Sequence, residues 1–271
     1  MIKSLVGVFC WLCFVVASPL LADEISPRMV LILDDLGVNA AQGRAALDLP
    51  GPITYAVLPF TPDATRFSIT AHAKPSKEVI LHAPMANISN LPLGPGGLYP
   101  HQSEVEFKQV LRNNLDSLPM VKGLNNHMGS LLTQQQQPMR WVMEVAKERD
   151  LFFIDSRTTA ATQAANMARE AGVPVLERRV FLDHEIDINA IEQQFLRAVE
   201  IALEEGEVIL IGHPYPETLE YLHRGLPLLD ELGIQRVTAS AFLRQEADLQ
   251  KRQALESQQR DMESALRLTS E

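Results

Sequence analysis

The sequence has few cysteines, few aromatic residues and a shortage of positive charge. Its two cysteines, Cys10 and Cys13, lie in an apolar N-terminal stretch, and no cysteine follows. If this stretch is removed, the remaining chain is indifferent to an oxidising compartment, as suits a periplasmic protein. The chain has 24 basic and 34 acidic residues and a formal net charge of −10. This charge disfavours nucleic acid and anionic lipid as partners and favours neutral or cationic ones.

The N-terminal stretch has the pattern of a secretory signal peptide. Lys3 precedes a nearly uncharged apolar run over residues 5–21, which ends at Ala22. The alternative is a retained membrane anchor, which needs about 20 apolar residues, whereas Pro19 interrupts this run. We therefore expect residues 1–22 to be cleaved on export, leaving a periplasmic protein without a membrane span.

From residue 28 onward, short apolar runs alternate with amphipathic segments, a pattern that indicates repeated βα units. Most of these runs are apolar throughout, as expected for strands covered on both faces. The runs that we interpret as strands are 29–33, 53–58, 78–81, 123–125, 151–154, 180–182, 208–211 and 235–237. We expect one α/β domain that buries a full core.

The longest predicted helix covers residues 188–205. Its apolar residues recur at helical spacing and are therefore predicted to lie in the core. They are Ile191, Phe195, Leu196, Val199 and Leu203.

Ionisable side chains follow six of the predicted strands. They are Asp34 with Asp35, His82, His127 after Asn126, Asp155, Asp183 and His213. Because the carboxyl ends of parallel strands converge on one side of a sheet or barrel, we expect a ligand site there. An aspartate after a strand can also cap the next helix, and this alternative stays open for Asp155 and Asp183.

The types of these residues suit a hydrolytic metal site. Two histidines and one carboxylate can hold a divalent metal with an open position, and zinc fits best. Such a metal activates water and polarises a carbonyl. A nearby carboxylate can then take the proton of the water while an acid protonates a leaving nitrogen.

Five ordered motifs resemble the divergent polysaccharide deacetylase family. They are Met29–Gly37 with its two aspartates, Leu81–Met85, Asn126–Ser130, Phe153–Thr158 and Gly212–Pro214. The resemblance covers residues 28–242, and residues 243–271 follow as a charged tail that is helical or disordered. That family is similar to the carbohydrate esterases, so the resemblance implies a distorted (β/α)7-type barrel.

The resemblance also implies roles for individual residues. Asp35 and His82 would be metal ligands, Asp34 the base and His213 the general acid, with Asp183 fixing the His213 tautomer. Ala86 stands where the ordinary deacetylases have a second ligand histidine, and we expect His127 to substitute for it. Substrate contacts are expected from Asn126, Ser130, Asp155 and Ser156. The arginine-proline motif of the family is not visible.

Three functions are compatible with these features. The first is a metal-dependent hydrolase that removes an acyl group from an N-acylated amino sugar of an envelope glycan. The second is a non-catalytic envelope protein that binds glycan or peptide and recruits a protein partner through its tail. The third is a hydrolase of another bond, such as a peptide amide of the cell wall.

Overall fold

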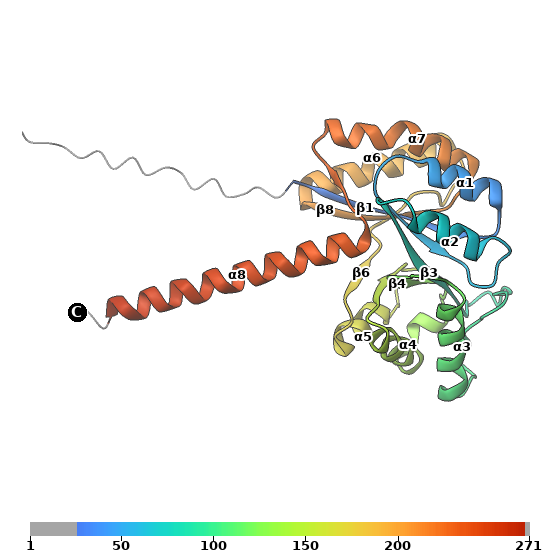
Figure 1. The fold of residues 1–271 in the computed structure, drawn as a ribbon, viewed down its shortest axis with the longest axis horizontal. Coiled ribbons are helices and arrows are strands. Elements are labelled where there is room, and N and C mark those ends of the chain that lie inside the picture. The colour runs from blue at the N-terminus through green and yellow to red at the C-terminus, as the bar shows by residue number, and fades with distance from the viewer. Residues whose placement is uncertain (1–25, 269–271) are drawn as a thin grey trace, which may run out of the picture.

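The computed structural model describes residues 26–268, along which strands and helices alternate (Figure 1). The strands are β1 (Arg28–Leu36), β2 (Ile53–Val57), β3 (Lys77–Met85), β4 (Gly123–Met128), β5 (Phe152–Asp155), β6 (Val175–Glu177), β7 (Val180–Phe181), β8 (Glu207–Gly212) and β9 (Gln235–Arg236). The helices are α1 (Ala40–Asp48), α2 (Ala64–His72), α3 (Glu104–Asp116), α4 (Gln136–Glu148), α5 (Ala164–Ala171), α6 (Ile188–Glu205), α7 (Pro216–Glu231) and α8 (Ala239–Leu268), with a 3-10 helix η1 (Leu132–Gln134) before α4. The expected signal peptide, residues 1–22, lies outside the described residues.

Polar side chains start several of these helices directly after a strand or loop. Asn39, Ser103 and Asp187 accept hydrogen bonds from backbone N–H groups in the first turns of α1, α3 and α6. Such caps satisfy donors that have no partner within the helix. Gly206 ends α6 with a positive φ of 85°, a conformation that glycine adopts without strain. The starts of α1, α3 and α6 and the end of α6 thus lie where the sequence supplies capping residues.

All strand pairs are parallel, and the sheet curls into a distorted barrel. The order is β6-β5-β4-β3-β2-β1-β8-β7, and β9 adds to β1. β6 pairs with β5 at one edge and β7 with β8 at the other, although Arg178 and Arg179 alone separate β6 from β7. Three peptide units span at most about 11 Å, so the two edges must lie close together. β6 and β7 together fill one strand position, which is divided between the two edges of the sheet. The expected (β/α)7-type barrel is thereby confirmed.

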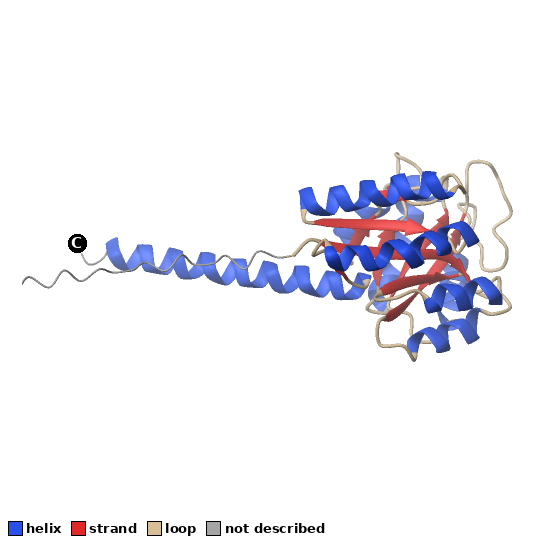
Figure 2. Cartoon of the chain, turned by 90° about the horizontal axis from the view of Figure 1, so that it is seen from above, coloured by secondary structure: helices blue, strands red, loops and turns tan. Residues whose placement is uncertain are grey.

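The sheet separates two apolar cores, because successive side chains of a strand point to opposite faces. In β1, Leu31 and Leu33 belong to the larger core between the sheet and the surrounding helices. Val30 and Ile32 belong to a smaller core inside the barrel. Figure 2 shows the strands enclosed by helices. Burial on both faces explains why most of the strand sequences are continuous apolar runs.

The structure differs from the sequence prediction in two places. β6 was not predicted, because its three residues lack a distinctive pattern. In α6, Ile191, Phe195 and Val199 are buried as expected, but Leu196 and Leu203 are 56% and 49% exposed. The predicted apolar face was therefore too wide, because Leu196 and Leu203 lie at the edge of the arc that contacts the sheet.

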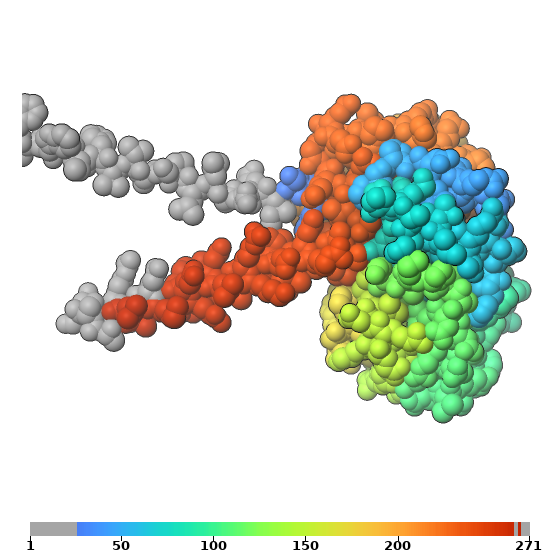
Figure 3. Space-filling view, in the orientation of Figure 1, coloured from blue at the N-terminus to red at the C-terminus, as the bar shows by residue number. Residues whose placement is uncertain are grey.

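Helix α8 leaves the barrel and projects from it (Figures 1 and 3). Its first turns pack beneath the barrel, where Phe242 enters the inner core. From Gln250 to Met262 every side chain is exposed. The charged tail is therefore helical as far as residue 268. Among the described residues, no helix has the length and apolar character needed to cross a membrane.

Candidate active site and metal centre

The carboxyl ends of the strands surround a cavity of about 140 Å³. Eleven residues line it: Asp34, His82, Asn126, His127, Met128, Ser156, Thr158, Arg178, Phe181, Ile211 and His213. They come from β1, β3, β4, β7, β8 and the loops around them. The structure therefore brings most of the ionisable residues that the sequence placed at strand ends into one site.

The backbone of β1 brings two adjacent carboxylates to the mouth of the barrel. In a regular strand, Asp34 would continue the inward face of Val30 and Ile32, and Asp35 would point outward. The pairing of β1 with β2 is irregular between Leu33 and Leu36, and Asp35 has a positive φ of 60°. This conformation is uncommon for a residue with a side chain. It allows the Asp35 carboxylate to join Asp34 at the mouth of the barrel.

Three potential ligand atoms form a nearly regular triangle. The Asp35 Oδ1 atom lies 3.0 Å from His127 Nδ1 and 3.2 Å from His82 Nε2. The two ring nitrogens lie 3.1 Å apart. Asp35 Oδ1 is buried, and none of these approaches gives it a well-aligned hydrogen bond within the described chain. Three potential ligand atoms this close together, one of them a buried carboxylate oxygen without a hydrogen-bond partner, are typical of a metal centre.

The orientation of His82 is fixed by Asn125. The Asn125 Nδ2 group donates to Asp34 Oδ1 at 2.8 Å, so its Oδ1 atom faces His82 Nδ1 at 2.7 Å. We assign the His82 proton to Nδ1, because Oδ1 of Asn125 can only accept. The Nε2 lone pair is then directed toward Asp35 and His127. Such an outer partner is what metal-binding histidines require.

The donor set fits a divalent metal. Zinc binds histidine nitrogen and carboxylate oxygen at about 2.0–2.2 Å, which places tetrahedral ligands about 3.3–3.5 Å apart. The observed separations of 3.0, 3.1 and 3.2 Å are slightly shorter. A small outward movement of each side chain would accommodate the ion. Three protein ligands leave a fourth position open, as in catalytic zinc sites.

His213 lies on the other side of the cavity and is held by Asp183. His213 Nδ1 is 3.0 Å from Asp183 Oδ1, and the His213 backbone N–H donates to Asp183 Oδ2 at 2.6 Å. The Thr218 hydroxyl donates to the same Oδ2 at 2.9 Å. The ring is thus anchored through Nδ1, and Nε2 is 3.9 Å from Asp35 Oδ2. His213 therefore presents Nε2 to the cavity.

The surroundings of the site shift the pKa values of Asp34, His213 and Asp35. Burial is the main cause that raises the pKa of Asp34, and it outweighs the opposing charges of His82 and His213. Burial opposes protonation of His213, but the hydrogen bond that its Nδ1 donates to Asp183 and the surrounding carboxylates raise its pKa to about 9. Burial acts against ionisation of Asp35 as well, yet His127 and His82 hold its pKa well below the usual range. Asp35 is thus ionised and His213 holds a proton near neutral pH, whereas the raised pKa of Asp34 makes its carboxylate a stronger base.

The four residues expected to contact substrate have different positions. Asn126 and Ser156 line the cavity, and the Asn126 Oδ1 atom accepts from the Ser156 backbone N–H at 3.0 Å. Asp155 instead accepts from the Arg157 N–H and the Thr162 hydroxyl, both at 2.9 Å. Ser130 Oγ accepts from the Ile88 N–H. Asp155 and Ser130 do not line the cavity, and their contacts are those of loop-stabilising residues.

Sequence reasoning missed several residues in and around the cavity. Asn125 was detectable, because it lies two positions before His127 and therefore on the same face of β4. The same alternation places Asp155 outside the barrel, since Ile154 points inside. Phe181 lies in the predicted strand 180–182, but an apolar residue there carries no signal of a site. Arg178 had no comparable signal either, because β6, the strand before it, was not predicted.

A profile of the divergent polysaccharide deacetylases matches residues 31–243. The chain belongs to this family. The match covers every strand end that contributes to the cavity, and it confirms the resemblance that the five motifs carry.

Two relatives are similar in sequence to this chain over most of its length. The uncharacterised protein YibQ of Escherichia coli K12 is 36% identical over 208 residues, which are 77% of this chain and 64% of that protein. An uncharacterised protein of Haemophilus influenzae is 32% identical over 221 residues, covering 80% and 79% of the two chains. The chain thus spans slightly less than two thirds of the length of the Escherichia coli relative.

Solved structures share the fold. An uncharacterised protein of Agrobacterium tumefaciens C58 has a TM-score of 0.77 at 20% identity, with 82% of this chain and 91% of that chain covered. A mutant of the peptidoglycan deacetylase PdaC from Bacillus subtilis has a TM-score of 0.50 at 14% identity, with 86% and 97% covered. A mutant of a carbohydrate esterase family 4 pseudoenzyme with restored activity also has 0.50 at 14% identity, with 80% and 68% covered. At these identities the similarity concerns the fold.

Proposed function

We propose that this protein is a metal-dependent hydrolase that removes an acyl group from an N-acylated amino sugar of an envelope glycan. The observation that carries the proposal is the triangle of Asp35, His82 and His127, flanked by Asp34 and His213. This arrangement combines a metal-ligand set with a carboxylate and an imidazole that can handle protons. Membership of a deacetylase family supports the same reaction class.

Each group has a distinct part in the proposed reaction. A divalent metal held by Asp35, His82 and His127 supplies Lewis acidity for a substrate carbonyl and for water. Asp34, buried and hydrogen-bonded to Asn125, accepts the proton of the attacking water on its carboxylate. His213 donates a proton from Nε2 to the leaving nitrogen, and Asp183 holds Nδ1 and stabilises the positive imidazolium.

The proposal includes zinc as the metal and the periplasm as the location. One carboxylate oxygen and two imidazole nitrogens suit zinc better than magnesium or calcium, which prefer oxygen ligands. The N-terminal signal pattern supports export to a compartment that contains envelope glycan. The net charge of −10 favours a neutral or cationic glycan overall, so an acidic sugar would bind only where a cationic side chain meets it locally.

A second candidate function is glycan or peptide binding without catalysis, with a protein partner recruited through α8. Its support is the exposed end of α8, where Leu255, Met262 and Leu266 are 59%, 61% and 69% exposed. They recur at intervals of seven and four residues and so lie on one side of the helix. The similarity to a pseudoenzyme fold is compatible with this candidate.

Metal content and hydrolysis together test the proposal. We would measure zinc by elemental analysis in the purified chain and in His82→Ala, His127→Ala and His184→Ala variants. His184 is exposed and contacts only Glu185 among the described ion pairs, so its variant is the matched control. We expect about one equivalent of zinc in the wild type and the control, and loss of zinc in the other two.

Release of the acyl group from acetylated glycan should follow the zinc content. Zinc bound without hydrolysis of acetylated glycan would favour the binding protein. Release of peptide fragments instead of acetate from cell-wall material would indicate a different bond. Absence of zinc in the wild type, even after zinc is supplied, would contradict the hydrolytic proposal.

A further inference from the structure

Arg178 occupies the point at which the barrel closes. It lies between β6 and β7, and its backbone N–H donates to Asp155 O on one side at 3.0 Å. The next amide, of Arg179, donates to Ile209 O on the other side at 2.9 Å. These bonds fix the Arg178 backbone at the rim of the cavity, and its side chain lines the cavity together with Asp34 and His213.

The guanidinium of Arg178 is held along one edge only. Nε donates to Ser156 O at 2.6 Å, and Nη2 donates to Arg157 O at 2.8 Å. Both acceptors are backbone carbonyls, so they orient the group without neutralising its charge. Nη1 has no hydrogen-bond partner within residues 26–268. The outer edge, formed by Nη1 and the second Nη2 proton, has the fork geometry that binds a carboxylate.

Arg178 also differs from the arginines around it. Arg157 and Arg169 both pair with Glu177, and Arg179 pairs with Glu205. No carboxylate of the described chain lies within ion-pair distance of Arg178. Burial and the charge of Arg157 lower its pKa, and the more distant carboxylates of Asp155 and Asp34 oppose this effect. A partly buried arginine at the rim of the cavity, without a carboxylate of the described chain at ion-pair distance, is available to an external anion.

The neighbours of Arg178 show which part of a substrate it would meet. Its guanidinium carbon lies 5.2 Å from the centre of the Phe181 ring, and the Phe181 and His213 rings are 5.5 Å apart. His213 is the group that would protonate the leaving nitrogen. The amine-bearing sugar therefore lies on the side of Phe181 and Arg178, and the acyl group lies toward the metal ligands.

We propose that Arg178 binds a carboxylate carried by the sugar itself, so that the preferred substrate is an acidic N-acylated amino sugar. This inference rests on the proposed function, because the role of His213 defines the sugar side. It assigns Arg178 to substrate selection and no role in the hydrolytic step. A charge-assisted hydrogen bond of this kind contributes about ten- to hundredfold in affinity.

The test compares two sugars that differ by one carboxylate. N-acetylmuramic acid carries a lactyl carboxylate, and N-acetylglucosamine lacks it. Each sugar would be titrated into the zinc-supplied full chain and its Arg178→Gln and Arg179→Gln variants, with the acetyl methyl signal followed by NMR. This signal reports both binding and released acetate. Arg179→Gln is the matched control, because it removes the same charge from the adjacent residue, whose partner is Glu205.

We expect the wild type and Arg179→Gln to bind the acidic sugar about tenfold or more tightly than the neutral one. Arg178→Gln should bind both alike. Thermal unfolding would be measured in parallel, but a structural role of Arg178 would not change the ratio of the two affinities. An Arg178→Lys variant, which keeps the charge and loses the fork, should recover part of the preference.

Failure of this inference is distinguishable from failure of the proposed function. Equal affinities for the two sugars in the wild type, or an unchanged ratio in Arg178→Gln, would overturn the assignment of Arg178. Equal kcat/KM values for acetate release from the two sugars would do so as well, while leaving the hydrolase intact. Tight, Arg178-dependent binding of the acidic sugar without acetate release would support Arg178 and contradict hydrolysis.

Discussion

The two ends of the barrel both bury charged groups, but only one end compensates them within the protein. At the base of the barrel, where the strands begin, Arg28 is 5% exposed. Its guanidinium contacts Glu207 and Glu246 and lies over the Phe242 ring. At the mouth, Asp34 and Asp35 face three imidazoles. Among the described residues, no lysine or arginine forms an ion pair with either aspartate.

This difference separates a structural charge cluster from a functional one. A buried charge is costly unless it is paired. The base satisfies this requirement by itself, because the Arg28 contacts tie the start of β1 to β8 and α8. The mouth satisfies it only through retained protons or an added cation. Buried charges that need an external partner are thus a better indicator of the site than burial alone.

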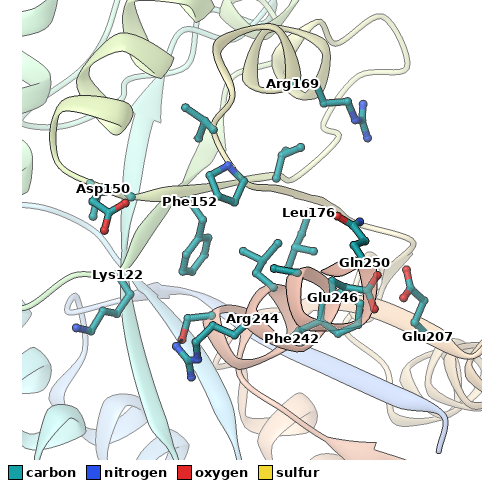
Figure 4. A pocket seen from close by; sticks show the side chains of 17 residues that line it. Lys122, Asp150, Phe152, Arg169, Leu176, Glu207, Phe242, Arg244, Glu246 and Gln250 are labelled. Carbon is teal, nitrogen blue, oxygen red and sulfur yellow. Dashed lines mark hydrogen bonds between the residues drawn. The ribbon is translucent and has the colours of Figure 1, made fainter. Parts of the chain in front are cut away.

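The size of a cavity would have given the wrong answer. A groove of about 760 Å³ at the base, between α8, β5 and β6, is larger than the cavity at the mouth. Figure 4 shows it lined by Phe152, Leu176 and Phe242, with charged side chains around them. Its charged groups do not converge on a point, whereas those of the mouth lie within 4.8 Å of one another at the ligand atoms. Convergence of donors therefore locates the site.

The largest expected effect concerns catalysis at the mouth. Asp34→Asn should lower kcat for deacetylation about 10²- to 10⁴-fold, because a general base is removed. Zinc content should stay unchanged, since Asp35, His82 and His127 remain. Steady-state kinetics and elemental analysis on the same preparation measure both quantities. Full activity in Asp34→Asn would show that another residue is the general base of the reaction.

A substitution at the base of the barrel should lower the stability of the protein and leave the function of the site at the mouth unchanged. Phe242→Ala should lower the free energy of unfolding by about 3–5 kcal/mol, because Phe242 is a buried aromatic residue of the inner core. Leu255→Ala, in the projecting part of α8, should change it by less than about 0.5 kcal/mol. Urea unfolding monitored by circular dichroism measures both. A similar loss in both variants would show that the projecting end of α8 is also packed.

The smallest expected effect is a pH dependence of the metal-free protein. The pKa of His213 is raised to about 9 in the folded state, against about 6.5 in the unfolded chain. The stabilisation is therefore fully present below about pH 6.5 and is lost as the pH rises through 9. Urea unfolding at pH 6.5 and 9.5 should show a decrease of about 1–3 kcal/mol.

The matched variant for this measurement is Asp183→Asn. It removes the carboxylate that accepts from the His213 ring and backbone, so the difference between the two pH values should shrink. A free energy of unfolding that rises with pH in the wild type would contradict the assigned protonation of His213.

Much of the fold and part of the site could be predicted from the sequence, because both depend on patterns between residues close together in the chain. Strands buried on both faces leave continuous apolar runs, and the parallel arrangement forces residues such as His82, His127 and His213 to one end. Asn125 and the outward position of Asp155 could have been inferred from the alternation of side chains along a strand. The burial of Leu196 was predicted wrongly, because spacing defines a helix face but not its width.

The sequence by itself determined the class of fold, the strand ends and the candidate ligands, because these depend on residue type and short-range periodicity. Only the tertiary structure decided that Asp35 turns toward the two histidines, that His127 stands beside His82, and that Arg178 lies at the rim. These features depend on a backbone irregularity, on strand register and on a segment divided between two sheet edges. Each is a relation between residues distant in the chain, and no local pattern encodes such a relation.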